Sequence, residues 1–140
     1  MSLVGAKVPA QDSSSVYNRL FLEAVVERQK GNDTAAFDLL QRCVQINPNA
    51  AESHYYLAHY YLKLKKNKEA LACFEKAARL EPSNTTYTET LAEMYVSLAD
   101  YKNAIALWEK IFETDGSRED VLEMLFRLYQ MDDNLDMAIN

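Results

Sequence analysis

The stretch LAHYYLKLKKNKEALACFEKAARLEP, residues 57–82, decides the fold. Leu57 and Tyr61 are four residues apart on a predicted helix, and Ala70 and Phe74 repeat this spacing after a lysine-rich break. Small side chains such as alanine let two helices approach closely, and aromatic side chains fill the space between them. A proline at the end of the stretch stops the second helix. The stretch therefore predicts a helical hairpin.

The positions that define this hairpin recur along the chain at intervals of 34 residues. The three series are Ala36, Ala70, Ala104 and Ala138; Leu57, Leu91 and Leu125; and Tyr61, Tyr95 and Tyr129. A period of this length, with helical spacing inside each unit, is typical of a solenoid whose units bury their apolar faces against their neighbours. We therefore expect an all-α repeat protein.

These residues resemble the tetratricopeptide repeat family. The second unit carries the family pattern most fully, at Leu57, Ala58, Tyr61, Ala70, Phe74, Ala77 and Pro82. The resemblance implies a right-handed superhelical solenoid of antiparallel helix-turn-helix repeats over residues 17–140. The repeats are expected at about 17–50, 51–84, 85–118 and 119–140, the last stopping soon after its trailing helix begins. Residues 1–16 contain little periodicity and are expected to form a flexible tail, with a possible expression remnant at residues 1–3.

The first unit departs from the family pattern, because Glu23 and Glu27 stand where later units have leucine and tyrosine. Like charges four residues apart on a helix repel each other, so this pair needs a physical reason. One interpretation is a solvated edge at the start of the solenoid, assisted by Arg19 or Arg42. The other is a surface that a partner or a preceding repeat would cover.

Composition and charge exclude several classes of function. The formal net charge of -6 argues against nucleic acid, because phosphate binding needs a basic surface. His54 and His59 are about 140° apart around a helix and cannot share a metal ion as an i, i+4 pair would. Cys43 and Cys73 are expected to be free packing residues. No apolar run has the length of a membrane span, and no catalytic motif or cofactor is expected.

The leading helices are expected to carry the functional surface. In the resembled family, their exposed face lines a concave groove that binds peptides or partner helices. The residues that the resemblance assigns to this groove are Phe21, Val25, Arg28, Tyr55, His59, Leu62, Lys63, Glu89 and Glu93. An apolar end and an acidic end would suit a partner with an apolar anchor and a basic residue. The alternative is that Tyr55 and His59 only pack against neighbouring leading helices.

One branch of the resembled family holds the C-terminal carboxylates of heat-shock chaperones with a clamp of lysine, asparagine and arginine. The matching positions here are Phe21, Val25, Tyr56, Thr86 and Thr90, which argues against that ligand class. The sequence therefore predicts a non-catalytic interaction scaffold with a different protein or peptide partner. The alternative is a segment of a longer repeat array, or a protein that self-associates through its C-terminal end. Free thiols favour a cytoplasmic location, and a bacterial envelope location stays open if a leader has been removed.

Overall fold

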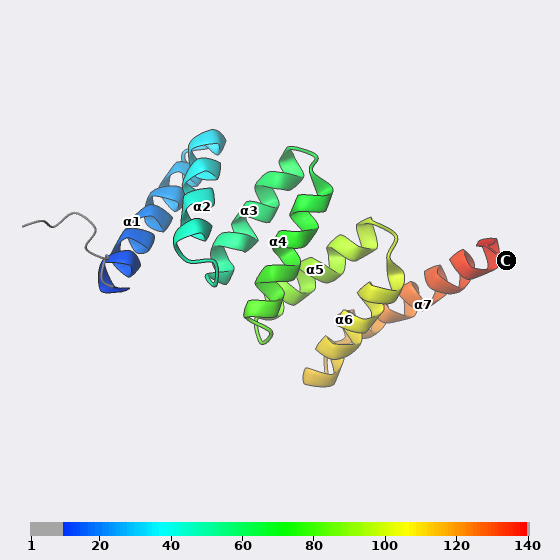
Figure 1. Cartoon of the computed structure of the whole chain (residues 1–140). Helices are drawn as coiled ribbons and strands as arrows, with labels where there is room; N and C mark the ends of the chain where they lie inside the picture. Colours follow the sequence, from blue (N-terminus) through cyan, green and yellow to red (C-terminus); the bar gives the residue numbers. More distant parts are fainter. Residues whose placement is uncertain (1–9, 140) are drawn as a thin grey trace, which may run out of the picture. The chain divides into compact units, whose positions relative to one another are not determined.

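The computed structural model describes residues 10–139, and every regular element in this range is an α-helix. The seven helices are α1 (Ala10–Gln29), α2 (Asp33–Ile46), α3 (Ala51–Lys63), α4 (Asn67–Leu80), α5 (Thr85–Ser97), α6 (Tyr101–Thr114) and α7 (Glu119–Ile139). Figure 1 shows their order along the chain. None of the described helices is long and apolar enough to cross a membrane.

The described part of the chain forms two compact units, and the boundary between them falls inside α4, between Cys73 and Phe74. In the first unit, α2 packs against α1 and α3. In the second unit, α6 packs against α5 and α7. Helices α2 and α6 thus each contact the leading helix before them and the leading helix after them, which is the arrangement that the repeat pattern predicts.

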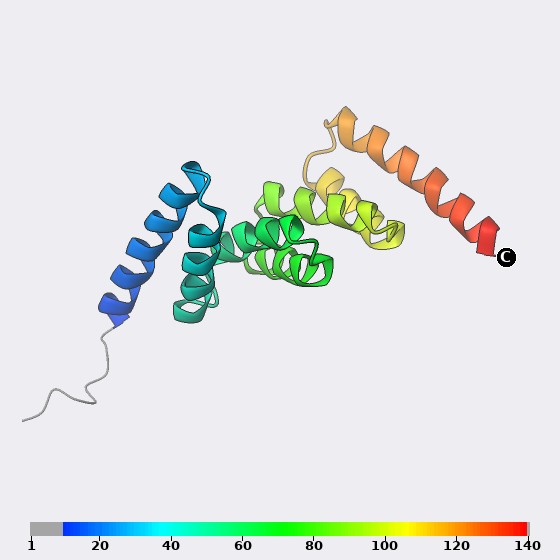
Figure 2. The ribbon, with the colours of Figure 1, turned by 90° about the horizontal axis from the view of Figure 1, so that it is seen from above.

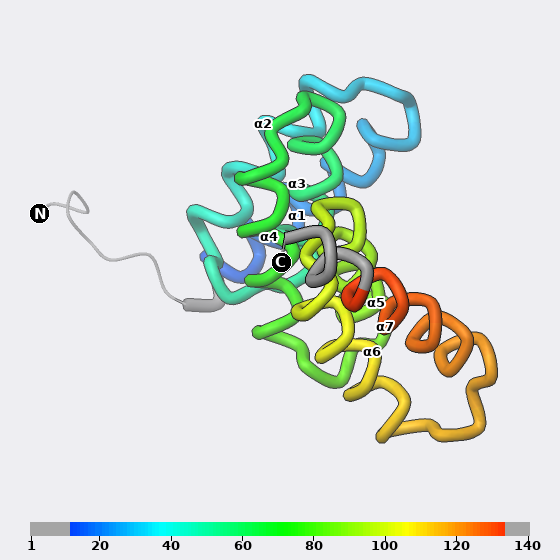
Figure 3. Tube along the Cα trace, turned by 90° about the vertical axis from the view of Figure 1, so that its right-hand side faces the viewer, coloured from blue at the N-terminus to red at the C-terminus, as the bar shows by residue number. Residues whose placement is uncertain are grey.

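The turns inside the hairpins share one backbone design, and their course can be followed in Figure 3. Gly31, Lys65 and Ala99 have positive φ angles of 80°, 59° and 58°, and they are 34 residues apart. The amide of the next residue then bonds to the carbonyl five positions back, as in the pair from Asn32 to Glu27 at 2.9 Å. This is the Schellman ending of an α-helix. The turn is therefore as periodic as the core, although only the first turn uses glycine.

The predicted small-residue positions form the centre of each hairpin. Ala36, Ala70 and Ala104 are each 0% exposed, which confirms their assignment to the core. In the first unit Ala36 clusters with Ala24 and Leu40, and in the second unit Ala104 belongs to the cluster of α5, α6 and α7. The side chain of the fourth member of the series, at position 138, lies outside the described residues.

Two expectations about the chain ends need correction. Helix α1 begins at Ala10, inside the segment that was expected to be a flexible tail, and residues 1–9 lie outside the described part. Helix α7 runs to Ile139 without a turn, as Figure 2 shows. The period would place a left-handed residue at Asp133, but that residue is helical. The fourth unit therefore has one long helix in place of a leading and a trailing helix.

Burial in the fourth unit and at the end of α3 follows from the helix contacts. Leu125 and Leu128 are 5% and 1% exposed because α6 packs against them. Tyr129 is 45% exposed. On α3, Tyr60 is buried, and Leu64 is 54% exposed because the helix ends at the preceding residue.

Candidate functional site

A row of aromatic side chains links α1 and α3 in the first unit. Tyr17 stacks on Phe21 with 5.9 Å between ring centroids, and Phe21 meets Tyr56 at 6.0 Å. Tyr55 contacts Tyr56 edge to face at 5.6 Å, and it contacts His59 in the same way at 4.8 Å. We call these five residues the aromatic row. Such ring pairs contribute about 0.5–1.5 kcal/mol beyond their buried area, so the row is a rigid feature of the unit.

Four members of the row remain partly open to solvent. Phe21, Tyr55, Tyr56 and His59 are half-buried, whereas Tyr17 is buried. A half-buried ring leaves one face or edge exposed, where another molecule can contact it, while contacts with neighbouring rings fix its rotamer. The row therefore combines exposed apolar area with low conformational freedom, which is the usual property of an anchor at a protein interface.

Arg28 gives the aromatic row a charged edge. Its guanidinium carbon lies 4.4 Å from the centroid of the Tyr56 ring, which is a cation–π contact. Val25 lies one turn before Arg28 on α1 and is half-buried, and Leu62 is half-buried near the end of α3. These three residues were expected at the binding surface, and the structure leaves all of them accessible.

The surroundings of His59 favour its neutral form. Burial lowers its pKa below the ordinary value of 6.5, and the nearby positive charges of Arg28 and Lys63 lower this pKa further. A neutral imidazole packed edge to face on Tyr55 acts as part of an aromatic surface. Protonation of His59 would introduce a third positive charge at this end of the unit.

Lys63 is directed toward α2. Its ammonium lies 3.2 Å from Asp33 and 5.2 Å from the centroid of the Tyr60 ring. Both charged groups are more than half exposed, so the ion pair is weak, and its contribution to stability is about 0–1 kcal/mol. Lys63 was expected to face a ligand together with Leu62, and its ammonium instead pairs with Asp33 of α2 while 62% of its side chain stays exposed.

The two predicted acidic residues belong to the second unit. Glu89 is half-buried and forms an ion pair with Arg118, which also pairs with Asp120 at 2.6 Å. Glu93 is exposed. Because Arg118 already neutralises Glu89, Glu93 is the more accessible carboxylate of the predicted pair. The structure thus places seven of the nine predicted residues in the first unit and two in the second.

Tyr17 is the member of the aromatic row that sequence reasoning missed. Its hydroxyl donates to Glu52 at 2.7 Å and lies 2.8 Å from the hydroxyl of the fully buried Ser53. Burial, together with Glu52, raises the pKa of Tyr17 far above its ordinary range. The spacing of Tyr17 and Phe21 at i, i+4 was the available signal, but position 17 had been taken as the start of the helix.

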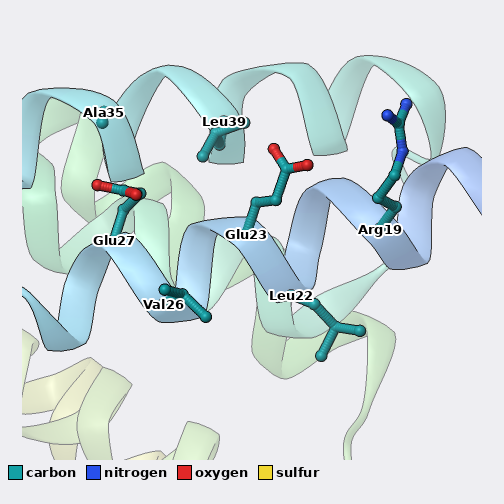
Figure 4. A pocket seen from close by; sticks show the side chains of 7 residues that line it. All are labelled: Arg19, Leu22, Glu23, Val26, Glu27, Ala35 and Leu39. Atoms are coloured by element: carbon teal, nitrogen blue, oxygen red, sulfur yellow. The ribbon is translucent and has the colours of Figure 1, made fainter.

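The acidic pair of the first unit lines a cavity of about 780 Å³ between α1 and α2. Figure 4 shows Arg19, Glu23 and Glu27 in a row along α1, opposite Leu39 of α2. Glu27 accepts a hydrogen bond from Asn32 at 2.6 Å, and this bond lowers its pKa. Glu27 thus connects the end of α1 to the turn before α2 through this hydrogen bond. Glu23 is exposed, which is what the interpretation as a solvated edge requires.

The remaining sequence expectations concern metal ions and thiols. Over the described residues, no group of three or more histidine, cysteine or acidic side chains is placed to hold a metal ion. Cys43 and Cys73 are free thiols, the first buried and the second half-buried, as predicted. Burial raises the pKa of Cys73 to about 11, because the charged thiolate is disfavoured in an apolar environment.

Three solved structures give the fold-level comparison. The crystal structure of MamA protein has a TM-score of 0.71 at 18% identity, covering 88% of this chain and 67% of MamA. The P58(IPK) TPR domain has a TM-score of 0.76 at 15% identity, covering 95% of this chain and 40% of that one. The first TPR domain of Spaghetti (RPAP3), bound to the HSP90 peptide SRMEEVD, has a TM-score of 0.66 at 19% identity, covering 90% and 97%. At these identities the similarity establishes the fold alone.

Family membership comes from the sequence. A comparison with curated proteins finds no match. Residues 3–77, more than half of the chain, match the model of the family described as anaphase-promoting complex, cyclosome, subunit 3. Together with the 34-residue period and the structural similarity to tetratricopeptide repeat domains, this match shows that the chain is a tetratricopeptide repeat protein of the anaphase-promoting complex, cyclosome, subunit 3 family.

Proposed function

We propose that this protein is a non-catalytic interaction scaffold, and that the aromatic row and its charged edge bind a peptide or a partner helix. The observation that carries the proposal is the fixed set of half-buried rings, Phe21, Tyr56, Tyr55 and His59, next to Arg28. Aromatic residues and arginine are the side chains that most often dominate binding energy at interfaces. Their rotamers are already fixed by mutual contacts, so binding costs little conformational entropy.

The proposed ligand has an apolar anchor that packs against the rings. The HSP90 peptide bound by Spaghetti ends in Glu-Glu-Val-Asp and is acidic. Here, two of the positions that would hold such a carboxylate clamp are Phe21 and Val25, which cannot pair with a carboxylate. The proposed ligand class therefore differs from that of the Spaghetti domain.

A second candidate function is self-association or stacking in a longer repeat array. The observation that favours it is the exposed apolar face of α7, where Leu122 and Phe126 are 54% and 65% exposed. Contiguous exposed apolar residues often mark an interface. In this alternative the ends of the chain carry the interaction, and the aromatic row has only a packing role.

A capture experiment distinguishes the two candidates. Wild-type protein and the Tyr55→Ala and His59→Ala variants would each be used to retain proteins from a native lysate. Leu98→Ala, an exposed leucine outside both candidate surfaces, is the matched control, and Leu122→Ala is the probe of the second candidate. We expect both variants of the row to lose partners that the control keeps, with binding weakened by more than ~1 kcal/mol. If the row variants retain every partner and only the Leu122→Ala variant loses them, the second candidate is correct.

A further inference from the structure

The second unit carries an open groove between α6 and α7. Its volume is about 480 Å³, and its apolar lining includes Phe112, Leu122, Phe126 and Tyr129. Its charged residues are both acidic, Glu109 and Glu113 of α6. We call this surface the α6–α7 groove. Phe126 is 65% exposed, so the floor of the groove presents a large apolar side chain to solvent.

The same unit contains an equivalent site one repeat earlier in the sequence, which we call the earlier site. Tyr95 donates its hydroxyl to Glu75 at 2.7 Å, and 34 residues later Tyr129 donates to Glu109 at 2.6 Å. Leu91 and its equivalent, residue 125, are buried beside the two tyrosines at 6% and 5% exposure. The two sites therefore share a tyrosine, a carboxylate and a leucine in the same arrangement.

The earlier site shows what kind of element covers such a surface. Leu107 and Lys110, which are three residues apart on α6, share a pocket with Glu75, Leu91 and Tyr95. A helix that presents a leucine and a lysine at i, i+3 thus borders the tyrosine–carboxylate pair. Along α7 the helix continues where earlier units turn, so no following helix in the described range provides the equivalent cover.

The α6–α7 groove is more apolar and more acidic than the earlier site. Phe126 stands where the earlier site has Ala92, which is 0% exposed, and Leu122 replaces a threonine. Glu113 stands where the earlier site has Arg79. An occupant must therefore tolerate a phenylalanine at a position that otherwise permits close helix packing, and it must bring positive charge to two carboxylates.

We propose that the α6–α7 groove binds an amphipathic helix of a partner protein that presents a leucine-like residue and a lysine or arginine three residues further on. The apolar residue packs on Phe126 and Leu122, and the basic residue faces Glu109 and Glu113. This surface is separate from the aromatic row, so the inference does not depend on the function proposed above.

The test uses the whole chain and two synthetic peptides. The first is a helix-stabilised peptide of the length of α6, with leucine and lysine alternating at i, i+3, i+4 and i+7 on one face. The second is the same peptide with every lysine replaced by glutamate. Binding would be measured by fluorescence anisotropy of labelled peptide. We expect the lysine peptide to bind roughly tenfold more tightly than the glutamate peptide, because both rim charges of the groove are negative.

Variants of the chain locate the binding surface. Phe126→Ala is expected to weaken binding of the lysine peptide by about fivefold or more. The double variant Glu109→Gln, Glu113→Gln is expected to weaken it by about threefold to tenfold. Leu98→Ala and Glu123→Gln are matched controls in the same unit, an exposed leucine and an exposed glutamate outside the groove, and should change binding by less than about twofold.

Three outcomes would overturn the proposal. The first is absence of binding by the lysine peptide. The second is equal binding of both peptides, or equal losses in the groove variants and the controls. The third is concentration-dependent self-association that Phe126→Ala abolishes while neither peptide binds, since this would assign the groove to a second copy of the chain.

Discussion

The hydrogen bonds of the Tyr17 hydroxyl allow a quantitative test of what stabilises the first unit. The Tyr17→Phe change removes one hydroxyl and keeps the ring that stacks on Phe21. It deprives Glu52 of a donor at 2.7 Å and Ser53 of a partner at 2.8 Å, and Ser53 is 0% exposed. A buried polar group that loses its partner costs ~1–3 kcal/mol. We therefore expect a loss of about 1–3 kcal/mol for Tyr17→Phe.

Tyr129→Phe is the matched control, because it also removes a tyrosine hydroxyl that donates to a glutamate, at 2.6 Å. Tyr129 is 45% exposed, so water replaces the lost bond and the expected cost is below about 0.5 kcal/mol. Urea unfolding followed by circular dichroism would give both free energies from the midpoint shifts at constant slope. Equal losses in the two variants, or a loss below about 0.5 kcal/mol for Tyr17→Phe, would refute the assignment of Tyr17 to a buried polar network.

Three further predictions concern packing, turns and pH. Ala70→Leu should overpack the fully buried alanine position and lower stability by ~1–3 kcal/mol, and an unchanged thermal midpoint would refute its assignment to the core. Ala99→Gly should stabilise the protein by up to about 1 kcal/mol, because Ala99 has a φ angle of 58°. Ala106→Gly, at an exposed position in the middle of α6, is the control and should destabilise the protein by about 1 kcal/mol. Thermal midpoints that move in the same direction in the two variants would contradict this prediction. Because the pKa of His59 is lowered in the folded state, the unfolded state binds the proton first, so stability should fall as the pH drops below 6.5. This part of the pH dependence should be absent from denaturation curves of His59→Gln, and an unchanged dependence would contradict the burial of the imidazole.

Much of the fold was predictable because the core positions are fixed by packing. Ala36, Ala70 and Ala104 occupy sites where two helices approach closely, and such sites restrict side-chain size strongly enough to leave a visible period. The turns were harder to recognise in the sequence, because Lys65 and Ala99 adopt a left-handed conformation that neither residue favours. Asp133 could have adopted this conformation equally well, so no local signal indicated that α7 would continue.

The candidate site was predictable only at the level of helix faces. The positions of Phe21, Tyr55 and His59 follow from helical spacing, because aromatic side chains with two torsion angles have few rotamers. Lys63 and Glu89 differ because their contacts depend on partners elsewhere in the chain. Asp33 is 30 residues before Lys63, and Arg118 is in the turn after α6, so no local pattern indicates either ion pair.

Chemical-shift mapping would test the central proposal most directly. Peptides would first be selected from a random library on the immobilised wild-type chain. The tightest peptide would then be titrated into isotope-labelled protein while backbone amide signals are followed. The proposed function predicts the largest shifts at the aromatic row, around Phe21, Tyr55 and His59, and loss of binding in Tyr55→Ala. Shifts confined to α6 and α7, with the row unaffected and Tyr55→Ala binding as tightly as wild type, would contradict it.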